Sequence, residues 1–143
     1  MKDGPLDVSE LPIFPIRTAG GFHFLSGVVG LATNKALVEG GIEAELTQIF
    51  KLIEKILSKH GSKMTDIVET TVFLVDEGDF RIMNRHFTEA FRDENLMPTR
   101  TTAGATWLPM GAKAQIAVIA VAHPNEPSDA KLREKQAHDK GRK

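Results

Sequence analysis

The sequence predicts an α/β (α+β) domain in which two helices cover one face of a mixed β-sheet. Apolar residues recur with a helical period at 42–57 and 80–91, whereas the segments around them are rich in β-branched residues. A chain of 143 residues has the size of a single domain and is long enough to bury one core. The expected order is therefore strand, strand, helix, strand, helix, strand, strand.

The first half of the chain predicts strands followed by a long helix. Residues 1–12 are polar and contain two prolines, so we expect no regular structure before the first strand. Residues 22–29 supply β-forming side chains and predict a strand. A helical stripe follows, made of Ile42, Leu46, Ile49, Phe50, Ile53, Ile56 and Leu57. Charged residues such as Glu43 and Glu45 are expected on the opposite face, and Gly61 is expected to end the helix.

The second half predicts a strand, a helix and two further strands. Residues 66–75 are mostly β-branched and apolar, which is typical of a covered strand. Asp79 is placed to cap a second helix. The apolar stripe of that helix is Phe80, Met83, Phe87 and Phe91. Residues 101–107 and 113–122 predict the last two strands, joined by a turn that contains proline and glycine.

Both faces of the last predicted strand are apolar. Side chains alternate along a strand, so one face carries Ile116, Val118 and Ala120 and the other carries Ala117, Ile119 and Val121. Two helices can cover only one face of the sheet. An apolar face without helices predicts burial against further copies of the same chain.

Residues 124–143 form a charged tail with few apolar side chains. Such a segment cannot bury enough apolar surface to offset its chain entropy, so we expect it to be disordered. The alternative is a short basic arm that contacts RNA or another protein. Mixed charges without an accompanying aromatic residue favour the solvated tail. The folded domain is therefore expected at 1–123.

Composition argues against several classes of function. Basic and acidic residues nearly balance, 18 against 19, so we expect neither nucleic acid nor a membrane as a partner. The sequence has no cysteine for disulfide or thiolate chemistry. Its five histidines lack metal-binding spacing, and we expect no metal and no cofactor. Because no apolar run reaches membrane-spanning length and no signal-peptide pattern occurs, we expect a cytoplasmic protein.

Arg100 is the candidate binding residue that the sequence itself indicates. It follows Pro98, which disfavours helix, and it opens a run of Thr and Ala residues that suits a strand. A guanidinium at the end of a strand can bind a carboxylate through two parallel hydrogen bonds. The alternative is an ordinary surface arginine in an ion pair.

Two segments make the sequence similar to the Rid family, the reactive intermediate (enamine/imine) deaminases, a family also known as endoribonuclease L-PSP. Residues 98–102 match its Pro-x-Arg-(Ser/Thr) element, and residues 108–120 match the Leu-Pro strand that follows it. The similarity extends over about 13–123. It implies a chorismate-mutase-like fold, a homotrimer, and sites in the clefts between subunits that bind a small carboxylate-bearing metabolite.

The resemblance implies binding roles for five residues at one cleft. Arg100 would bind the substrate carboxylate. The other four would contact the ligand and are Ser26, Gly27, Asn84 and Thr102. A small hydroxyl group that simply fits a tight strand is the alternative for Ser26 and Thr102. For Asn84, the alternative is a hydrogen bond to the backbone.

The catalytic position departs from the family pattern. Gln115 stands where active deaminases have the glutamate that places a water. A glutamine can hold a water by hydrogen bonds but cannot take its proton. The family's Ile-Gly-Pro-Tyr also occurs here as Ile-Phe-Pro-Ile at 13–16, and the chain has no tyrosine. Activity is therefore expected to be slow or directed at a different substrate.

Three functions are compatible with these patterns. The first is hydrolysis of small 2-imino or 2-enamino acids to 2-oxo acids and ammonia, with Gln115 as an altered catalytic residue. The second is a non-catalytic trimer in which Arg100 binds a carboxylate metabolite. The third is activity on RNA, as the older family name suggests. The negative charge of the body and the lack of a basic-aromatic surface argue against the third.

Overall fold

The computed structural model describes residues 15–124, so the expectations for 1–12 and for nearly all of 124–143 lie outside the described residues. The element order is β1 (Ile16–Ala19), β2 (Phe22–Leu25), α1 (Gly41–Lys59), β3 (Ile67–Leu74), α2 (Phe80–Ala90), β4 (Thr99–Gly104) and β5 (Ala114–Val121). Short 3₁₀ turns lie between several of them. This order confirms the predicted alternation of strands and helices. Within 15–124, no helix is long and apolar enough to cross a membrane.

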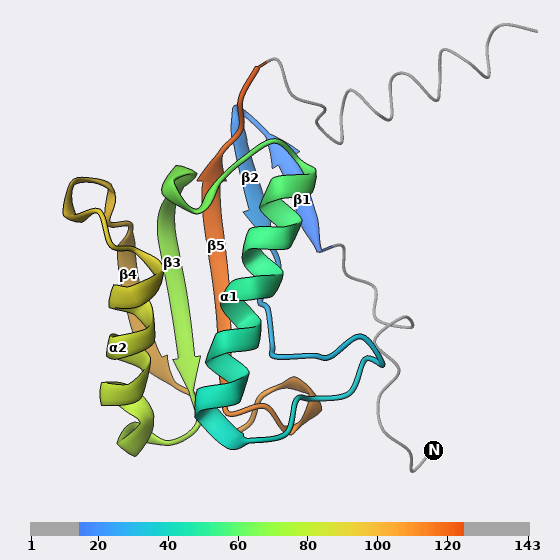
Figure 1. Ribbon diagram of the computed structural model, residues 1–143, viewed down its shortest axis with the longest axis vertical. Coiled ribbons are helices and arrows are strands. Elements are labelled where there is room, and N and C mark those ends of the chain that lie inside the picture. Colours follow the sequence, from blue (N-terminus) through green and yellow to red (C-terminus); the bar gives the residue numbers. More distant parts are fainter. Residues whose placement is uncertain (1–14, 125–143) are drawn as a thin grey trace, which may run out of the picture.

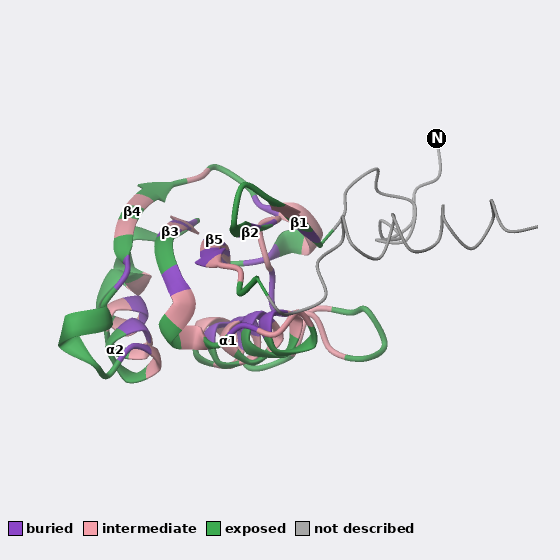
Figure 2. Cartoon of the chain, turned by 90° about the horizontal axis from the view of Figure 1, so that it is seen from above, coloured by how far each residue is buried: buried purple, intermediate pink, exposed green. Residues whose placement is uncertain are grey.

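The strands form one mixed sheet with both helices on the same side of it (Figure 1; Figure 2). The strand order is β1-β2-β5-β3-β4, in which β3 and β4 are parallel and the other pairs are antiparallel. β4 is therefore an edge strand, and it lies beside α2, whereas α1 lies over the centre of the sheet (Figure 2). The predicted fold class is confirmed.

The core lies between α1 and the middle of the sheet. The apolar stripe of α1 buries Leu46, Ile49, Ile53 and Leu57. These side chains belong to one cluster with the buried residues of β5, which are Ala114, Ile116, Val118 and Ala120. Burying one such aliphatic side chain contributes about 1.5–3 kcal/mol to folding. The core thus fixes β5, the strand that carries Gln115, against α1.

The prediction that Glu45 lies on the charged face of α1 is wrong. Its side chain is only 1% exposed, and its carboxylate accepts a 2.7 Å hydrogen bond from the backbone N–H of Lys113. The backbone of α1 at this point also approaches Gly30 so closely that a Cβ on Gly30 would lie 2.9 Å from the Glu45 backbone. Glu45 therefore ties the start of β5 and the loop after β2 to the helix.

Two predicted strands end earlier than expected. β2 ends at Leu25, because the chain then leaves regular pairing and meets β5 again only at the single bridge between Val28 and Ile116. β4 begins at Thr99 and ends at Gly104, where its parallel partner β3 also ends. Glycines in both terminal segments weaken strand pairing there.

The expected cap of α2 also differs. Asp79 occupies the N-cap position but makes no capping hydrogen bond through its side chain. A 3₁₀ turn (Glu77–Asp79) precedes the helix, and Asp76 closes that turn by accepting a 2.8 Å hydrogen bond from the Gly78 N–H. The expected side-chain cap of α2 is therefore not formed, and the acidic cap at Asp76 belongs to the 3₁₀ turn before the helix.

A cluster of charged side chains links α1 to α2. Glu43 of α1 accepts hydrogen bonds from Arg85 and from His86 of α2, the latter at 2.7 Å. The hydrogen bond with His86 is the largest cause that holds the pKa of Glu43 below its usual value, and the positive charges of Arg85 and His86 act in the same direction. This contact helps to set the position of α2, whose inner face carries the candidate site.

The face of the sheet opposite the helices has no helix over it (Figure 2). Neighbouring residues on paired strands point to the same face, so Phe24 lies beside Ile119 and Phe22 lies beside Val121 on this open face. The two phenylalanines are 39% and 43% exposed, Phe22 and Phe24 respectively. The sequence analysis predicted, from the two apolar faces of the last strand, that one apolar face would have no helix over it. The exposed phenylalanines agree with that prediction.

The core makes a direct stability prediction. Ile53→Ala is expected to lower the free energy of unfolding by about 2–5 kcal/mol, because it removes a fully buried side chain and leaves a cavity. Leu96→Ala is the matched control: its side chain is 48% exposed, and the change should cost less than about 1 kcal/mol. Urea unfolding followed by circular dichroism measures both. Equal stability losses would show that the core lies elsewhere.

Candidate functional site

The side chain of Arg100 lies between β4 and α2. In the parallel pairing of β3 and β4, Arg100 stands beside Thr70, which is fully buried on the helix side of the sheet. The guanidinium carbon lies 4.9 Å from the centre of the Phe87 ring and 5.6 Å from that of Phe80. One guanidinium nitrogen, Nη1, also lies 4.0 Å from the sulfur of Met83. The apolar stripe of α2 is thus a platform for the cation of Arg100.

Within residues 15–124 the guanidinium of Arg100 has no carboxylate partner. The ion pairs there join Glu43 to Arg85 and His86, and Asp66 to His123. Arg100 is half-buried, and its recorded contacts are the two aromatic rings and the sulfur. The alternative of an ordinary arginine in an ion pair finds no partner in this part of the chain. Cation–π contacts orient a guanidinium while leaving its N–H groups free for an anion.

Asn84 and Thr102 lie in the same layer as Arg100. Asn84 falls one turn after Phe80 on α2, and Thr102 stands beside buried Val72, on the helix side of β4. Both carry a buried oxygen without a hydrogen-bond partner among the described residues, Oδ1 of Asn84 and Oγ1 of Thr102. An unsatisfied buried polar group costs about 1–3 kcal/mol, so such groups mark places where a ligand or water completes the structure.

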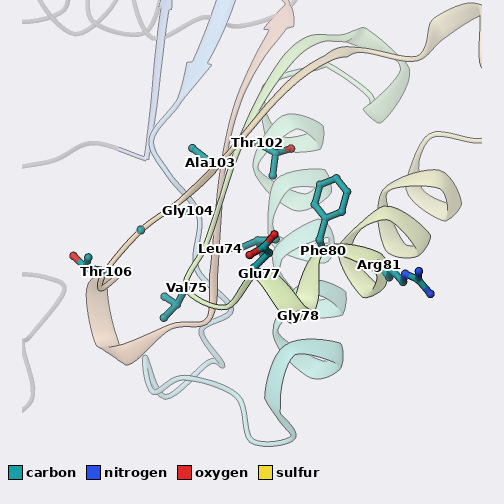
Figure 3. Close-up of a pocket in the computed structure, with 11 residues that line it drawn as sticks. Leu74, Val75, Glu77, Gly78, Phe80, Arg81, Thr102, Ala103, Gly104 and Thr106 are labelled. Carbon is teal, nitrogen blue, oxygen red and sulfur yellow. The ribbon is translucent and has the colours of Figure 1, made fainter.

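A cavity of ≈ 820 Å³ opens beside these residues (Figure 3). Thr102 of β4 and Phe80 of α2 line it, together with the chain that follows β3 and β4. The ring of Phe80 both contacts the guanidinium of Arg100 and forms part of the cavity wall. The cavity therefore lies next to a cation that has no carboxylate partner in the described part of the chain, and it is large enough for a small metabolite.

Ser26, Gly27 and Gln115 meet at a second cavity of ≈ 350 Å³. The Gln115 side chain packs directly on Gly27, where an added Cβ would lie 2.6 Å from its Cδ, and its Nε2 donates a long 3.5 Å hydrogen bond to the Gly27 carbonyl. Met110, which lines the same cavity, has a left-handed backbone (φ 64°) that is unusual for a residue with a side chain. A side chain at position 27 would therefore displace the amide of Gln115 from its present position.

The two groups lie on opposite faces of the sheet. Gln115 stands beside Phe73, whereas Thr102 stands beside Val72, the next residue along β3. Since successive residues of a strand point to opposite sides, Gln115 faces the open side and Thr102 faces the helices. A single chain therefore does not gather the six candidate residues into one cleft: Arg100, Asn84 and Thr102 form one half, and Ser26, Gly27 and Gln115 form the other.

Sequence reasoning missed the part played by two aromatic residues. Phe80 and Phe87 were predicted as part of the apolar stripe of α2, yet both rings also contact the guanidinium of Arg100. Phe80 is 41% exposed. No sequence pattern links these residues to Arg100, because their contact depends on how α2 packs against the edge strand. Among the described residues, no cluster of acidic, histidine or cysteine side chains could hold a metal ion.

Comparison with known proteins is consistent with this geometry. A family model described as "Endoribonuclease L-PSP" matches residues 15–122. A "RutC family protein" from Aquifex aeolicus is 32% identical over 124 residues, which cover 85% of this chain and 99% of that protein. A "2-iminobutanoate/2-iminopropanoate deaminase" from Homo sapiens is 31% identical over 102 residues, 71% of this chain and 73% of the human protein.

Solved structures show the same architecture. The crystal structure of RidA from an Antarctic Psychrobacter species superposes with a TM-score of 0.74 at 26% identity, covering 82% of this chain and 92% of that one. The YjgF gene product of E. coli superposes with a TM-score of 0.72, also at 26% identity, covering 86% and 96% of the two chains. The five-stranded mixed sheet with two helices is thus a shared fold.

Proposed function

Because this chain belongs to the Rid (endoribonuclease L-PSP) family, we propose that it hydrolyses small 2-imino or 2-enamino acids to 2-oxo acids and ammonia. The proposal rests on the guanidinium of Arg100, which has no carboxylate partner among residues 15–124 and stacks on two rings beside a cavity. Relatives named as 2-iminobutanoate/2-iminopropanoate deaminases, 31% to 34% identical, support the substrate class. Their substrates carry the carboxylate that Arg100 is suited to bind.

Each half of the site has a distinct task in this proposal. Arg100 binds the substrate carboxylate through two N–H groups, which places the adjacent C=N carbon at the cavity. Thr102 and Asn84 supply the two unsatisfied oxygens, which accept hydrogen bonds from the imine or amine nitrogen as it forms. Gln115 holds the attacking water by its amide but cannot take its proton.

The proposed site requires a second subunit. Arg100 and Gln115 lie on opposite faces of one sheet, so they can share a cleft only if Gln115 comes from a neighbouring chain. The apolar open face, which includes Phe22, Phe24 and Ile119, supports assembly through that face. We propose the homotrimer that the family resemblance implies, with one cleft at each of its subunit contacts.

The proposal is tested on imino acids generated in the assay. A flavin-dependent amino-acid oxidase produces 2-iminobutanoate continuously, and semicarbazide traps the imine that survives. Added protein should lower the trapped fraction well below that in buffer, and it should release the matching amounts of 2-oxobutanoate and ammonia.

The same assay separates catalysis from binding alone. If imine survival equals that in buffer while calorimetry detects binding of 2-oxobutanoate, the protein binds a carboxylate ligand without deaminase activity. If neither hydrolysis nor binding is detected, the assignment of the Arg100 site is wrong.

A further inference from the structure

We propose that Glu77 is the general base of the reaction and takes the proton that Gln115 cannot accept. This inference rests on the proposed function and adds a catalytic residue to it. Glu77 follows the end of β3 and begins the 3₁₀ turn before α2. Its carboxylate lines the ≈ 820 Å³ cavity together with Thr102 and Phe80.

The position of Glu77 is fixed by the turn that carries it. Asp76 accepts a hydrogen bond from the Gly78 N–H, and the Asp79 N–H bonds to the Asp76 carbonyl at 3.0 Å, so the backbone on both sides of Glu77 is held. Figure 3 shows the Glu77 carboxylate turned from this loop into the cavity, whereas the guanidinium of Arg81 points away from it. A held backbone with a side chain directed into a cavity is suited to placing a catalytic group.

The Glu77 carboxylate is free to accept a proton. Within residues 15–124 it makes no hydrogen bond and no ion pair, and it is the one carboxylate among the described residues that line this cavity. Arg81 also lines the cavity, but among residues 15–124 it forms no ion pair with Glu77. A carboxylate held in an ion pair would be a weaker base, so its unpaired state favours a role in proton transfer.

The cavity that Glu77 lines adjoins the guanidinium of Arg100 through Phe80. Phe80 lies under the guanidinium of Arg100 and also lines the cavity, and Thr102 is two residues from Arg100 on the same face of β4. A 2-imino acid has its C=N carbon bonded directly to the carboxylate carbon. With the carboxylate on Arg100, the C=N carbon would face the part of the cavity wall formed by Phe80 and Thr102, and Glu77 belongs to the lining of the same cavity.

The proposed step is balanced by one water molecule. The water oxygen forms a bond to the C=N carbon while Glu77 takes one of its protons, and the π electrons of the C=N bond move to nitrogen, which accepts a proton from solvent. In the resulting carbinolamine, Glu77 returns its proton to the amino nitrogen. The C–N bond breaks to release ammonia, and the hydroxyl oxygen forms the C=O bond as its proton leaves to solvent. No oxidant, metal or cofactor enters this step.

Glu77→Gln tests the assignment, because it removes the base while keeping size and polarity. We expect kcat/KM for 2-iminobutanoate to fall on the order of a hundredfold, the usual contribution of a general base. Binding of 2-oxobutanoate should be unchanged, because Arg100 still holds the carboxylate.

The matched control is Glu89→Gln, which changes an exposed carboxylate of α2 in a groove between α1 and α2, away from the proposed site. It should leave both imine hydrolysis and binding of 2-oxobutanoate unchanged. Activity of Glu77→Gln within about twofold of the unchanged protein would overturn the role of Glu77 and leave the proposed function intact. A parallel loss of 2-oxobutanoate binding would show a binding or structural role instead and would also overturn it. No hydrolysis by the unchanged protein would overturn both proposals.

Discussion

Arg100→Ala is expected to weaken binding of 2-oxobutanoate by at least about a hundredfold. A charge-assisted hydrogen bond contributes about 1.5–3 kcal/mol, and a guanidinium can supply two of them to one carboxylate. The rings of Phe80 and Phe87 orient this guanidinium, so little rotamer entropy is lost when the ligand binds. Isothermal titration calorimetry of the assembled protein measures the change.

Two variants distinguish the guanidinium from positive charge in general. Arg100→Lys keeps the charge but loses the planar fork, and we expect it to bind with intermediate affinity. Arg81→Ala is the matched control, because Arg81 also lines the cavity but its side chain points away (Figure 3). Its affinity should stay within a few-fold of the unchanged protein. If Arg100→Ala binds as well as the unchanged protein, the carboxylate is held elsewhere.

The second large effect is expected at the open face of the sheet. Ile119→Arg should convert the assembly to monomers at micromolar concentration, because it places a charge where the proposed interface must bury apolar surface. Imine hydrolysis should be lost at the same time, since Arg100 and Gln115 would no longer share a cleft. Multi-angle light scattering after size exclusion gives the mass, and the imine-trapping assay gives the activity.

An arginine at an exposed helix position controls for added charge. Ser58→Arg, at the end of α1, should leave both mass and activity unchanged. A stable monomer for the unchanged protein would contradict both the trimer and the intersubunit site. A trimer that survives Ile119→Arg would place the interface on another surface.

The sequence was sufficient for the elements of the fold because its apolar patterns are strong. The stripe from Leu46 to Leu57 is buried as expected, and the alternation along β5 is visible directly in the burial of Ile116 and Val118. These patterns depend only on local spacing, which the backbone geometry of helices and strands fixes. The order of the elements and the positions of both helices therefore followed from local patterns, whereas the first strand and the ends of β2 and β4 did not.

Contacts between residues far apart in the sequence could not be predicted from these local patterns. Glu45 reads as a surface residue by its charge, yet it is buried because the Lys113 N–H needs an acceptor there. The platform under Arg100 depends on the packing of Phe80 and Phe87 against an edge strand. Glu77 carried no sequence signal, since only the fold places its loop beside Thr102.

The separation of Arg100 from Gln115 depends on strand register. The family resemblance implied that both residues act at one cleft. It did not show which face of the sheet each side chain occupies within a single chain. Thr102 pairs with Val72 and Gln115 pairs with Phe73, so these two side chains point to opposite faces. Arg100 lies two residues before Thr102 and shares its face. A shift of one residue in either pairing would reverse this result, so sequence alone cannot supply it.

A crystal structure with 2-oxobutanoate bound tests the central claim most directly. We expect the ligand carboxylate to accept two hydrogen bonds from Arg100 of one subunit, with Gln115 of a neighbouring subunit and Glu77 facing its carbonyl carbon. Thr102 Oγ1 and Asn84 Oδ1 should then have hydrogen-bond partners. A ligand that occupies the ≈ 350 Å³ cavity beside Gln115 without contacting any Arg100, or that binds within a single subunit, would contradict this account.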